Sequence, residues 1–351
     1  MTDLGLKLYG PRSTSNLSPR TCCGIHFSAK NMNLTNLTTQ NFEEIFDQII
    51  ELKISEEEIK KFLLELNEEN LPTNAFIGAV ASLKKRAKKI SAPENAIDVC
   101  GTGGDKLKTL NVSTAVCFVI AAAGIPVAKH GNKAISSLSG SADIFSELGI
   151  KISPDVGEIE KNLREKNLAF IFGPFFHEAM KNVAAIRKSL AVPTIFNFLG
   201  PLLNPANTRF QLIGVSRRDV MQKMETCRRL SGVETKTSYF VHGFDGMDEI
   251  TLTDNSYLLH NGREEIIDPT KFGLKKVTLE ALRGFDPKHN AQKLIALLEG
   301  EKSAYQDIVV LNAAFAFKLV GRVNKIEEGI ELARELINNG SANSILKRCQ
   351  N

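Results

Sequence analysis

The sequence predicts an α/β protein with a small N-terminal helical domain and a large α/β domain, built on a central sheet that is mostly parallel but mixed. Three observations predict this class. Apolar residues between Phe42 and Val80 recur at helical spacing. From Ile97 onward, short apolar runs alternate with helical ones, an order typical of β-α-β units. Later, Asn261-Gly262 between two short runs predicts a hairpin with a type I′ turn, which adds antiparallel strands.

Three segments are expected along the 351 residues. Residues 1–31 show no helical or strand period and are predicted to be a disordered tail, either a transit peptide or residues upstream of a true start at Met32. Residues 32–95 are predicted to form the helical domain, joined by helices from about 175–195. Residues 96–351 are then the α/β domain.

Two local patterns stand out in the helical segment. Ser55 and Glu58 have the spacing of a capping box ahead of an apolar stripe, so a helix is expected to begin there. The basic run Lys84–Arg86 with Lys88 and Lys89 has the composition of an anion patch, but a solvated helix face is the better interpretation.

The elements expected beyond residue 96 follow from runs of apolar residues and from turn residues between them. The strands are Ile97–Cys100, Pro126–Ala128, Leu168–Phe172, Phe210–Ser216, Ser238–His242, Ser256–His260 and Glu264–Asp268. The helices are Val112–Ala123, Asp155–Lys166, about His177–Lys188, Arg218–Leu230, Leu294–Leu298, Ile308–Leu319 and Ile326–Ile337.

Composition limits the classes of function. The net charge is +4 and the 44 basic residues are interspersed with 40 acidic ones, so no nucleic-acid partner is expected. The six cysteines lack metal-finger spacing and indicate free thiols in a reducing compartment. The longest apolar stretch, Val116–Ala128, is interrupted by Gly124 and Pro126 and is too short to cross a membrane. We therefore expect a cytoplasmic protein without a membrane partner, or a plastid protein if residues 1–31 are a transit peptide.

A glycine-rich turn, Gly101–Asp105, joins the first predicted strand to the helix from Val112. Glycines let backbone N–H groups converge, and a helix N-terminus favours anions, so strand, turn and helix together suit a phosphate. Asn111, Ser113 and Thr114 add side-chain donors at the helix start. The turn alone could also be merely tight, and it is neither a Walker loop nor a dinucleotide fingerprint.

A second donor-rich segment, Lys129–Lys133 with Ser136 and Ser137, is predicted as a loop after the next strand. Two such loops suggest a polyphosphate ligand that is bound from two sides. Asp248 and Glu249 follow a later strand beside glycines, where their carboxylates suit a Mg²⁺ ion that bridges protein and phosphate oxygens. The alternative for these two residues is a solvated acidic turn.

Aromatic residues from Phe170 to Phe176 precede His177, and Arg187 follows ten residues later. This set suits a flat anionic ring, because arginine can pair with a carboxylate through two hydrogen bonds. The alternative is that His177 is structural and that Phe172 and Phe175 belong to the core.

Four motifs, GTGGD at 101–105, NVST at 111–114, KHGN at 129–132 and GSAD at 140–143, occur in an order that resembles the anthranilate phosphoribosyltransferase family. The resemblance runs from Thr39 to the C-terminus. It includes DGMDE, where Met247 stands in place of the family's leucine, and Thr194–Pro205, which we interpret as an architectural hinge between the two lobes.

The resemblance implies transfer of a phosphoribosyl group from phosphoribosyl pyrophosphate to anthranilate, with Mg²⁺, two ions per subunit, and a homodimer formed through the helical lobe. It assigns phosphoribosyl pyrophosphate to Gly101, Gly104, Asp105, Thr109, Asn111, Val112, Ser113, Thr114, Lys129, His130, Gly131, Asn132, Lys133, Ala134, Ile135, Ser136, Ser137 and Ser141. The resemblance also assigns anthranilate binding to Gly101, Asn132, His177 and Arg187, and metal binding to Ser113, Asp248 and Glu249. No residue is obliged to act as a general base.

The sequence departs from the family's pattern at Glu178, Ala185, Ala191 and Pro193, which puts the detail of the anthranilate pocket in question, although Arg187 is kept. Two other functions are considered. A pyrimidine nucleoside phosphorylase would share the two-lobed fold, and the combined motifs argue against it. An inactive nucleic-acid-binding relative would show a larger basic excess.

Overall fold

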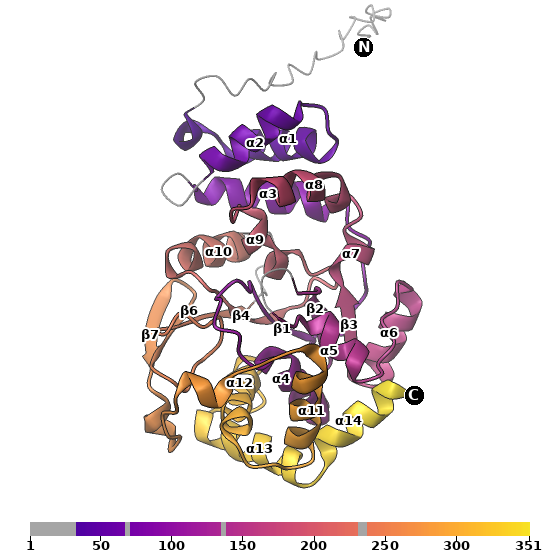
Figure 1. The fold of residues 1–351 in the computed structure, drawn as a ribbon, viewed down its shortest axis with the longest axis vertical. Helices are drawn as coiled ribbons and strands as arrows, with labels where there is room; N and C mark the ends of the chain where they lie inside the picture. The colour runs from indigo at the N-terminus through magenta and orange to yellow at the C-terminus, as the bar shows by residue number, and fades with distance from the viewer. Residues whose placement is uncertain (1–32, 67–70, 135–137, 231–236) are drawn as a thin grey trace, which may run out of the picture.

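The computed structural model describes residues 33–66, 71–134, 138–230 and 237–351 (Figure 1). The predicted tail, and the predicted ligand residues Ile135, Ser136 and Ser137, lie outside this range. Within it, no helix is long and apolar enough to cross a membrane. The cysteines in it, Cys100, Cys117, Cys227 and Cys349, are free thiols.

A single mixed sheet forms the centre of the described chain, in the order β3-β2-β1-β4-β5-β6-β7. The first five strands in this order are parallel, and β6 and β7 are antiparallel additions. The strands are β1 (Ile97–Gly101), β2 (Val127–Gly131), β3 (Leu168–Phe172), β4 (Phe210–Gly214), β5 (Thr237–Gly243), β6 (Ser256–His260) and β7 (Arg263–Ile267). Asn261 and Gly262 both have positive φ in the β6–β7 turn, which confirms the predicted hairpin.

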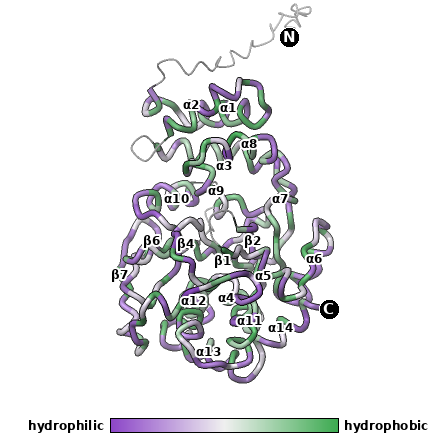
Figure 2. The backbone as a smooth tube through the Cα atoms, viewed as in Figure 1, coloured by the Kyte–Doolittle hydropathy of each residue, from purple (hydrophilic) through white to green (hydrophobic). Residues whose placement is uncertain are grey.

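One face of the sheet is covered by helices that are drawn below it in Figure 1. They are α4 (Val112–Ala122), α5 (Ser141–Glu147), α11 (Pro287–Leu298), α12 (Ala304–Leu319), α13 (Ile326–Asn338) and α14 (Ser341–Gln350). The helices α4 and α12 are apolar on nearly every side and lie in the centre of the main core, where Figure 2 shows green segments. Gly329 of α13 faces Ala314 so closely that a Cβ would lie 2.8 Å from the alanine Cα, so a small residue is required there.

The other face carries a helical lobe made of α1 (Thr39–Ile50), α2 (Glu56–Glu65), α3 (Thr73–Lys84) and α8 (Met180–Leu190), drawn at the top of Figure 1. Its core contains Phe42, Phe46 and Phe62, and continues through α9 (Phe196–Leu199) and α10 (Arg218–Leu230) onto the sheet. The shorter elements of the chain are α6 (Val156–Glu165), α7 (Gly173–Phe176), η1 (Leu34–Asn36), η2 (Gly200–Leu203), η3 (Pro269–Phe272) and η4 (Leu279–Leu282).

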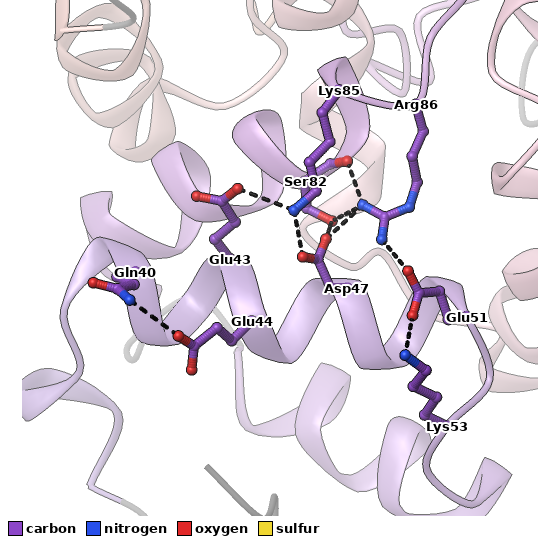
Figure 3. Close-up of polar contacts among 9 residues, drawn as sticks. All are labelled: Gln40, Glu43, Glu44, Asp47, Glu51, Lys53, Ser82, Lys85 and Arg86. Atoms are coloured by element: carbon purple, nitrogen blue, oxygen red, sulfur yellow. Dashed lines mark hydrogen bonds and ion pairs between the residues drawn. The ribbon is translucent and has the colours of Figure 1, made fainter. Parts of the chain in front are cut away.

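The basic run at the end of α3 is ion-paired rather than simply solvated (Figure 3). Lys85 pairs with Glu43 and Asp47 of α1, and Arg86 pairs with Asp47 and Glu51. These contacts join α1 to α3 and neutralise the positive charge locally, so the run is not an anion patch.

The segment Thr194–Pro205 connects the helical lobe to the sheet through backbone carbonyls. His130 of β2 is bonded to Gly200 O at 3.1 Å, and Gln211 of β4 donates to Pro201 O at 2.8 Å. Asn204 donates to Ala128 O at 2.9 Å. Because these bonds reach strands on both sides of β1, the segment is a fixed link between the lobe and the sheet.

The sequence predicted most of these elements. The ranges of β3 and α10, and the capping box of Ser55 and Glu58, are confirmed as predicted. Four helices, α5, α7, α9 and α14, were missed, and the helix predicted from about His177 begins at Met180. The strand predicted at Pro126–Ala128 is longer, since β2 continues to Gly131.

Candidate active site

The glycine-rich turn begins at the carboxyl end of β1 and is held by two neighbouring strand ends. Thr102 N donates to Gly214 O at 2.9 Å, and its hydroxyl lies 3.0 Å from the Ser216 hydroxyl beyond β4. Gly103 N donates to Asp248 Oδ2 at 2.7 Å. The carboxyl ends of parallel strands meet at one edge of a sheet, which is the usual place for a ligand in this architecture.

The two predicted metal-binding carboxylates lie against this turn and against the first turn of α4. Glu249 is 9% exposed, and its Oε1 accepts a hydrogen bond from Ser113 N at 3.1 Å. Burial, and next the charge of Asp248, raises the pKa of Glu249 to about 8. Burial, and next Asp248, likewise raises the pKa of Asp105 to about 7. Asp105, Asp248 and Glu249 therefore lie close together, and a bound cation would offset their negative charge.

The carboxylates at this site could supply only part of a metal coordination sphere. In the described ranges, no group of three or more His, Cys, Asp or Glu side chains could hold an ion by itself. Mg²⁺ commonly keeps waters and takes one or two carboxylates together with substrate phosphates, so Asp248, Glu249 and the Ser113 hydroxyl fit such a partial set.

Two glycines make room for the Asp248 loop. A Cβ on Gly101 would overlap the Asp248 carboxylate, and a Cβ on Gly214 would overlap the Asp248 backbone carbonyl. Gly200, in contrast, has no atom within 4 Å of such a Cβ. The glycine at 214 was not predicted as a site residue, because it lies inside the predicted strand Phe210–Ser216, whereas β4 ends at Gly214.

We expect Gly214→Ala to displace the Asp248 loop, because the overlap involves the backbone, which cannot rotate away. Overpacking of this kind destabilises by about 1–3 kcal/mol. Urea denaturation should show this loss, and calorimetry should show Mg²⁺ affinity in the presence of pyrophosphate falling about tenfold. Gly200→Ala is the matched control and should change neither quantity. Wild-type metal affinity in Gly214→Ala would contradict the steric account.

The segment predicted as a second phosphate loop is partly a buried strand. Lys129 is 2% exposed within β2, and its Nζ donates to Val99 O at 2.5 Å and to Ser113 Oγ at 3.0 Å. The loop prediction was therefore wrong for Lys129, His130 and Gly131, because β2 lies between β1 and β3 and extends further than its apolar residues. In this structure the Lys129 ammonium orients Ser113 and does not reach outward.

Asp143 of α5 accepts hydrogen bonds from backbone N–H groups on either side of residues 135–137. Asp143 Oδ2 accepts from Ala134 N at 3.0 Å and from Gly140 N at 2.9 Å, while Asn132 O accepts from Ala142 N at 3.1 Å. A Cβ on Gly131 would overlap the Ser141 hydroxyl, so this glycine brings β2 close to the start of α5. The amide of Asn132 remains exposed at the end of β2.

The N-cap of α4 is a junction of three elements. Asn111 Nδ2 donates to Ser139 O at 3.1 Å, and its Oδ1 accepts from Asn290 of α11 at 3.0 Å. The Tyr305 hydroxyl of α12 donates to Asn111 O at 2.9 Å. Sequence reasoning missed Asn290 and Tyr305, since a contact between residues so distant in sequence has no local signal.

The remaining residues predicted to bind the ligand differ in how far they are exposed to solvent. Gly104 and Lys133 are exposed, and Thr109, which bridges to Arg283, is partly buried. Val112 and Thr114 are buried at the start of α4.

His130 of β2 and His177, at the end of α7, lie side by side. Their rings are 5.5 Å apart at 64°, and a Cβ on Gly173 would lie 3.2 Å from His130 Nε2. His177 Nε2 is bonded to Leu203 O at 2.9 Å. Burial lowers the pKa of His130 to about 4 and that of His177, with His130 as the next cause, to about 3. Both rings are therefore neutral near pH 7, and the bond to Leu203 O gives His177 a structural contact.

We expect His177 to make the chain sensitive to acid. Its pKa is lower in the folded state than its ordinary value of 6.5, so between those pH values the unfolded chain binds more protons and stability falls as pH drops. The raised pKa values of Asp105 and Glu249 change stability in the opposite direction over part of this range. The prediction therefore concerns the difference in unfolding free energy between wild type and a variant at His177. The stability advantage of wild type over His177→Gln should shrink by about 2 kcal/mol from pH 7 to pH 5 in urea denaturation. A constant difference would contradict it.

Arg187 lies on the inner side of α8. Its guanidinium carbon is 5.2 Å from the centroid of the Phe196 ring, and burial alone lowers its pKa. No acidic side chain in the described residues pairs with it. The departures from the family pattern at Glu178, Ala185, Ala191 and Pro193 are all exposed, whereas Arg187 is partly buried. No contact among the described residues joins Arg187 to Asn132.

Residues 93–343 match the family described as "Glycosyl transferase family, a/b domain", which makes the chain a glycosyl transferase. It is 40% identical over 317 residues to the anthranilate phosphoribosyltransferase of Methylocella silvestris, covering 89% of this chain and 90% of that protein. The crystal structure of the Thermus thermophilus enzyme has a TM-score of 0.84 at 31% identity, covering 91% of this chain and 98% of that one. The Saccharomyces cerevisiae enzyme in complex with PRPP and Mg has a TM-score of 0.83 at 25% identity, covering 90% and 94%.

The chain therefore belongs to the anthranilate phosphoribosyltransferases. The two-lobed α/β fold predicted from its motifs is confirmed, and so is the choice of this family over the pyrimidine nucleoside phosphorylases.

Proposed function

We propose that the carboxyl ends of β1, β2 and β5 form the active site, with the phosphoribosyl group of phosphoribosyl pyrophosphate bound over the turn Gly101–Asp105. The reaction transfers this group to anthranilate, giving N-(5-phosphoribosyl)anthranilate and pyrophosphate, in L-tryptophan biosynthesis. The observation that carries the placement is the pair of bonds from Gly103 N to Asp248 and from Ser113 N to Glu249. They bring two carboxylates to the turn and helix start that suit phosphate.

Asp248, Glu249 and the Ser113 hydroxyl would hold Mg²⁺, and we propose two ions per subunit. What supports this assignment is the donor set: each carboxylate has one oxygen bonded to backbone N–H, and the raised pKa values of Asp105 and Glu249 reflect a cluster that lacks compensating charge. Bound Mg²⁺ would neutralise pyrophosphate as it leaves C1 of the ribose.

The chain's own residues position the reactants. Asn132 and Arg187 are proposed to orient anthranilate, whose amine forms the new bond to C1 as the bond from C1 to pyrophosphate breaks and the amine releases a proton. A cationic C1 accepts a weakly basic amine, so positioning and charge stabilisation supply most of the rate. The buried Lys129 would act on Ser113 rather than on the substrate, given its contacts.

The direct test is the fluorescence of product formed from anthranilate and phosphoribosyl pyrophosphate, with and without Mg²⁺. Mg²⁺-dependent formation of the phosphoribosyl adduct is expected. Product formation that is indifferent to chelation would remove the metal from the proposal.

We also propose that the helical lobe forms a homodimer. Leu52 and Leu64 in this lobe are about half exposed, at 50% and 49%, which supports an apolar contact there. Sedimentation velocity should give twice the mass of the chain, and Leu64→Glu should shift it toward the monomer.

A further inference from the structure

Two lysines in the loop between Asp105 and Thr109 have an unusual backbone. Lys106 and Lys108 have φ values of 62° and 57°, in the left-handed region that favours glycine. Gly103 and Gly104, just before them, are also left-handed. Strain of this kind persists only where the surroundings impose it, and it is concentrated at ligand sites.

The surroundings do impose it. Leu107 N donates to Asp105 Oδ1 at 3.2 Å, and Gly284 N donates to Lys108 O at 2.7 Å. The Leu107 side chain packs against the main core, whereas both lysine side chains are exposed. The hydrogen-bonded backbone therefore holds two exposed lysines directly after Asp105, beside the proposed site.

These two charges have no acidic partner in the described part of the chain. Some exposed lysines elsewhere do have one: Lys88 pairs with Glu178 at 2.6 Å and Lys276 with Asp254 at 3.1 Å. Arg283, which bridges to this loop, is itself paired with Glu280 at 3.1 Å. Cations held at a phosphate site without a counterion are suited to a substrate anion.

We infer that Lys106 and Lys108 bind a phosphate group of the phosphoribosyl substrate, a role that rests on the proposed function of the turn beside them. Either the 5-phosphate or the pyrophosphate has the required chemistry. Lys106 and Lys108 lie between the residues assigned to that ligand by the family motifs and are themselves outside those motifs.

The test compares Lys106→Gln/Lys108→Gln with Lys318→Gln. Lys318 is an exposed lysine at the end of α12 opposite Tyr305, roughly 20 Å along the helix. The double variant should raise the KM for phosphoribosyl pyrophosphate about tenfold and weaken the salt dependence of kcat/KM, with the KM for anthranilate within about twofold. Lys318→Gln should match wild type.

Calorimetry with ribose 5-phosphate and with Mg²⁺-pyrophosphate separates the two phosphates, because only the ligand that the lysines contact should bind more weakly to the double variant. Lys106→Gly gives a second check: the melting temperature should rise by about 2 °C or more as strain is released, while the KM for phosphoribosyl pyrophosphate also rises. A structural role alone would not combine a more stable fold with weaker substrate binding.

An unchanged KM and salt dependence in a folded double variant would overturn the inference. The proposed function would stand in that case if substitution of Asp248 and Glu249 still abolished the Mg²⁺ dependence, so the two failures are distinguishable.

Discussion

Asp248→Asn combined with Glu249→Gln should lower kcat/KM for phosphoribosyl pyrophosphate by at least about 100-fold, because it removes both carboxylates that are proposed to bind the metal. The fold should survive. An amide oxygen can still accept from Gly103 N and Ser113 N, and the substitution removes repulsion within a cluster where burial and neighbouring charge raise the pKa of Glu249 to about 8. Titration of the rate with Mg²⁺ is the decisive measurement.

The matched control is Glu327→Gln with Glu331→Gln, two exposed glutamates on α13 that carry the same change in charge. This control should keep the wild-type Mg²⁺ dependence. Melting curves add a readout independent of catalysis, since Mg²⁺ with pyrophosphate should stabilise wild type and the control but not the site variant. If the site variant retained the ordinary Mg²⁺ dependence, the metal assignment would be lost.

The proposed site follows most directly from the sequence where neighbouring residues in the chain carry the chemistry. Asp248 and Glu249 could be predicted because carboxylates beside glycines follow a strand, and both bond to the segments predicted to bind phosphate. The loop from Gly101 was predicted for the same reason: glycine spacing and a following helix are visible in a short window.

Contacts across the sheet could not be predicted in this way. The polar sequence from Lys129 predicts a loop, yet Lys129 is inside β2, where its ammonium is satisfied by Val99 of the neighbouring strand and by Ser113 of α4. The contact of Ser216 with Thr102 also depends on strand order, because β4 lies beside β1 although more than 100 residues separate the two strands. Periodicity identifies an element but not its neighbours.

In the proposed site, the binding of anthranilate depends most on Arg187. In the described structure its guanidinium is partly buried against Phe196 and has no acidic partner, while burial lowers its pKa. A partly desolvated cation without a counterion is well suited to a carboxylate, and such a charge-assisted contact is worth about 2–3 kcal/mol.

Arg187→Ala should therefore raise the KM for anthranilate by roughly 30- to 150-fold, while the KM for phosphoribosyl pyrophosphate scarcely changes. The KM of Arg187→Lys for anthranilate should lie between those of wild type and Arg187→Ala, since lysine keeps the charge but cannot form two parallel hydrogen bonds. Aniline lacks the carboxylate, so it should react poorly with wild type and lose little more with Arg187→Ala. If Arg187 served only to pack α8 against Phe196, the alanine variant would have a lower melting temperature, and its KM values for the two substrates would change alike. An unchanged anthranilate KM in a stable variant would remove Arg187 from the site.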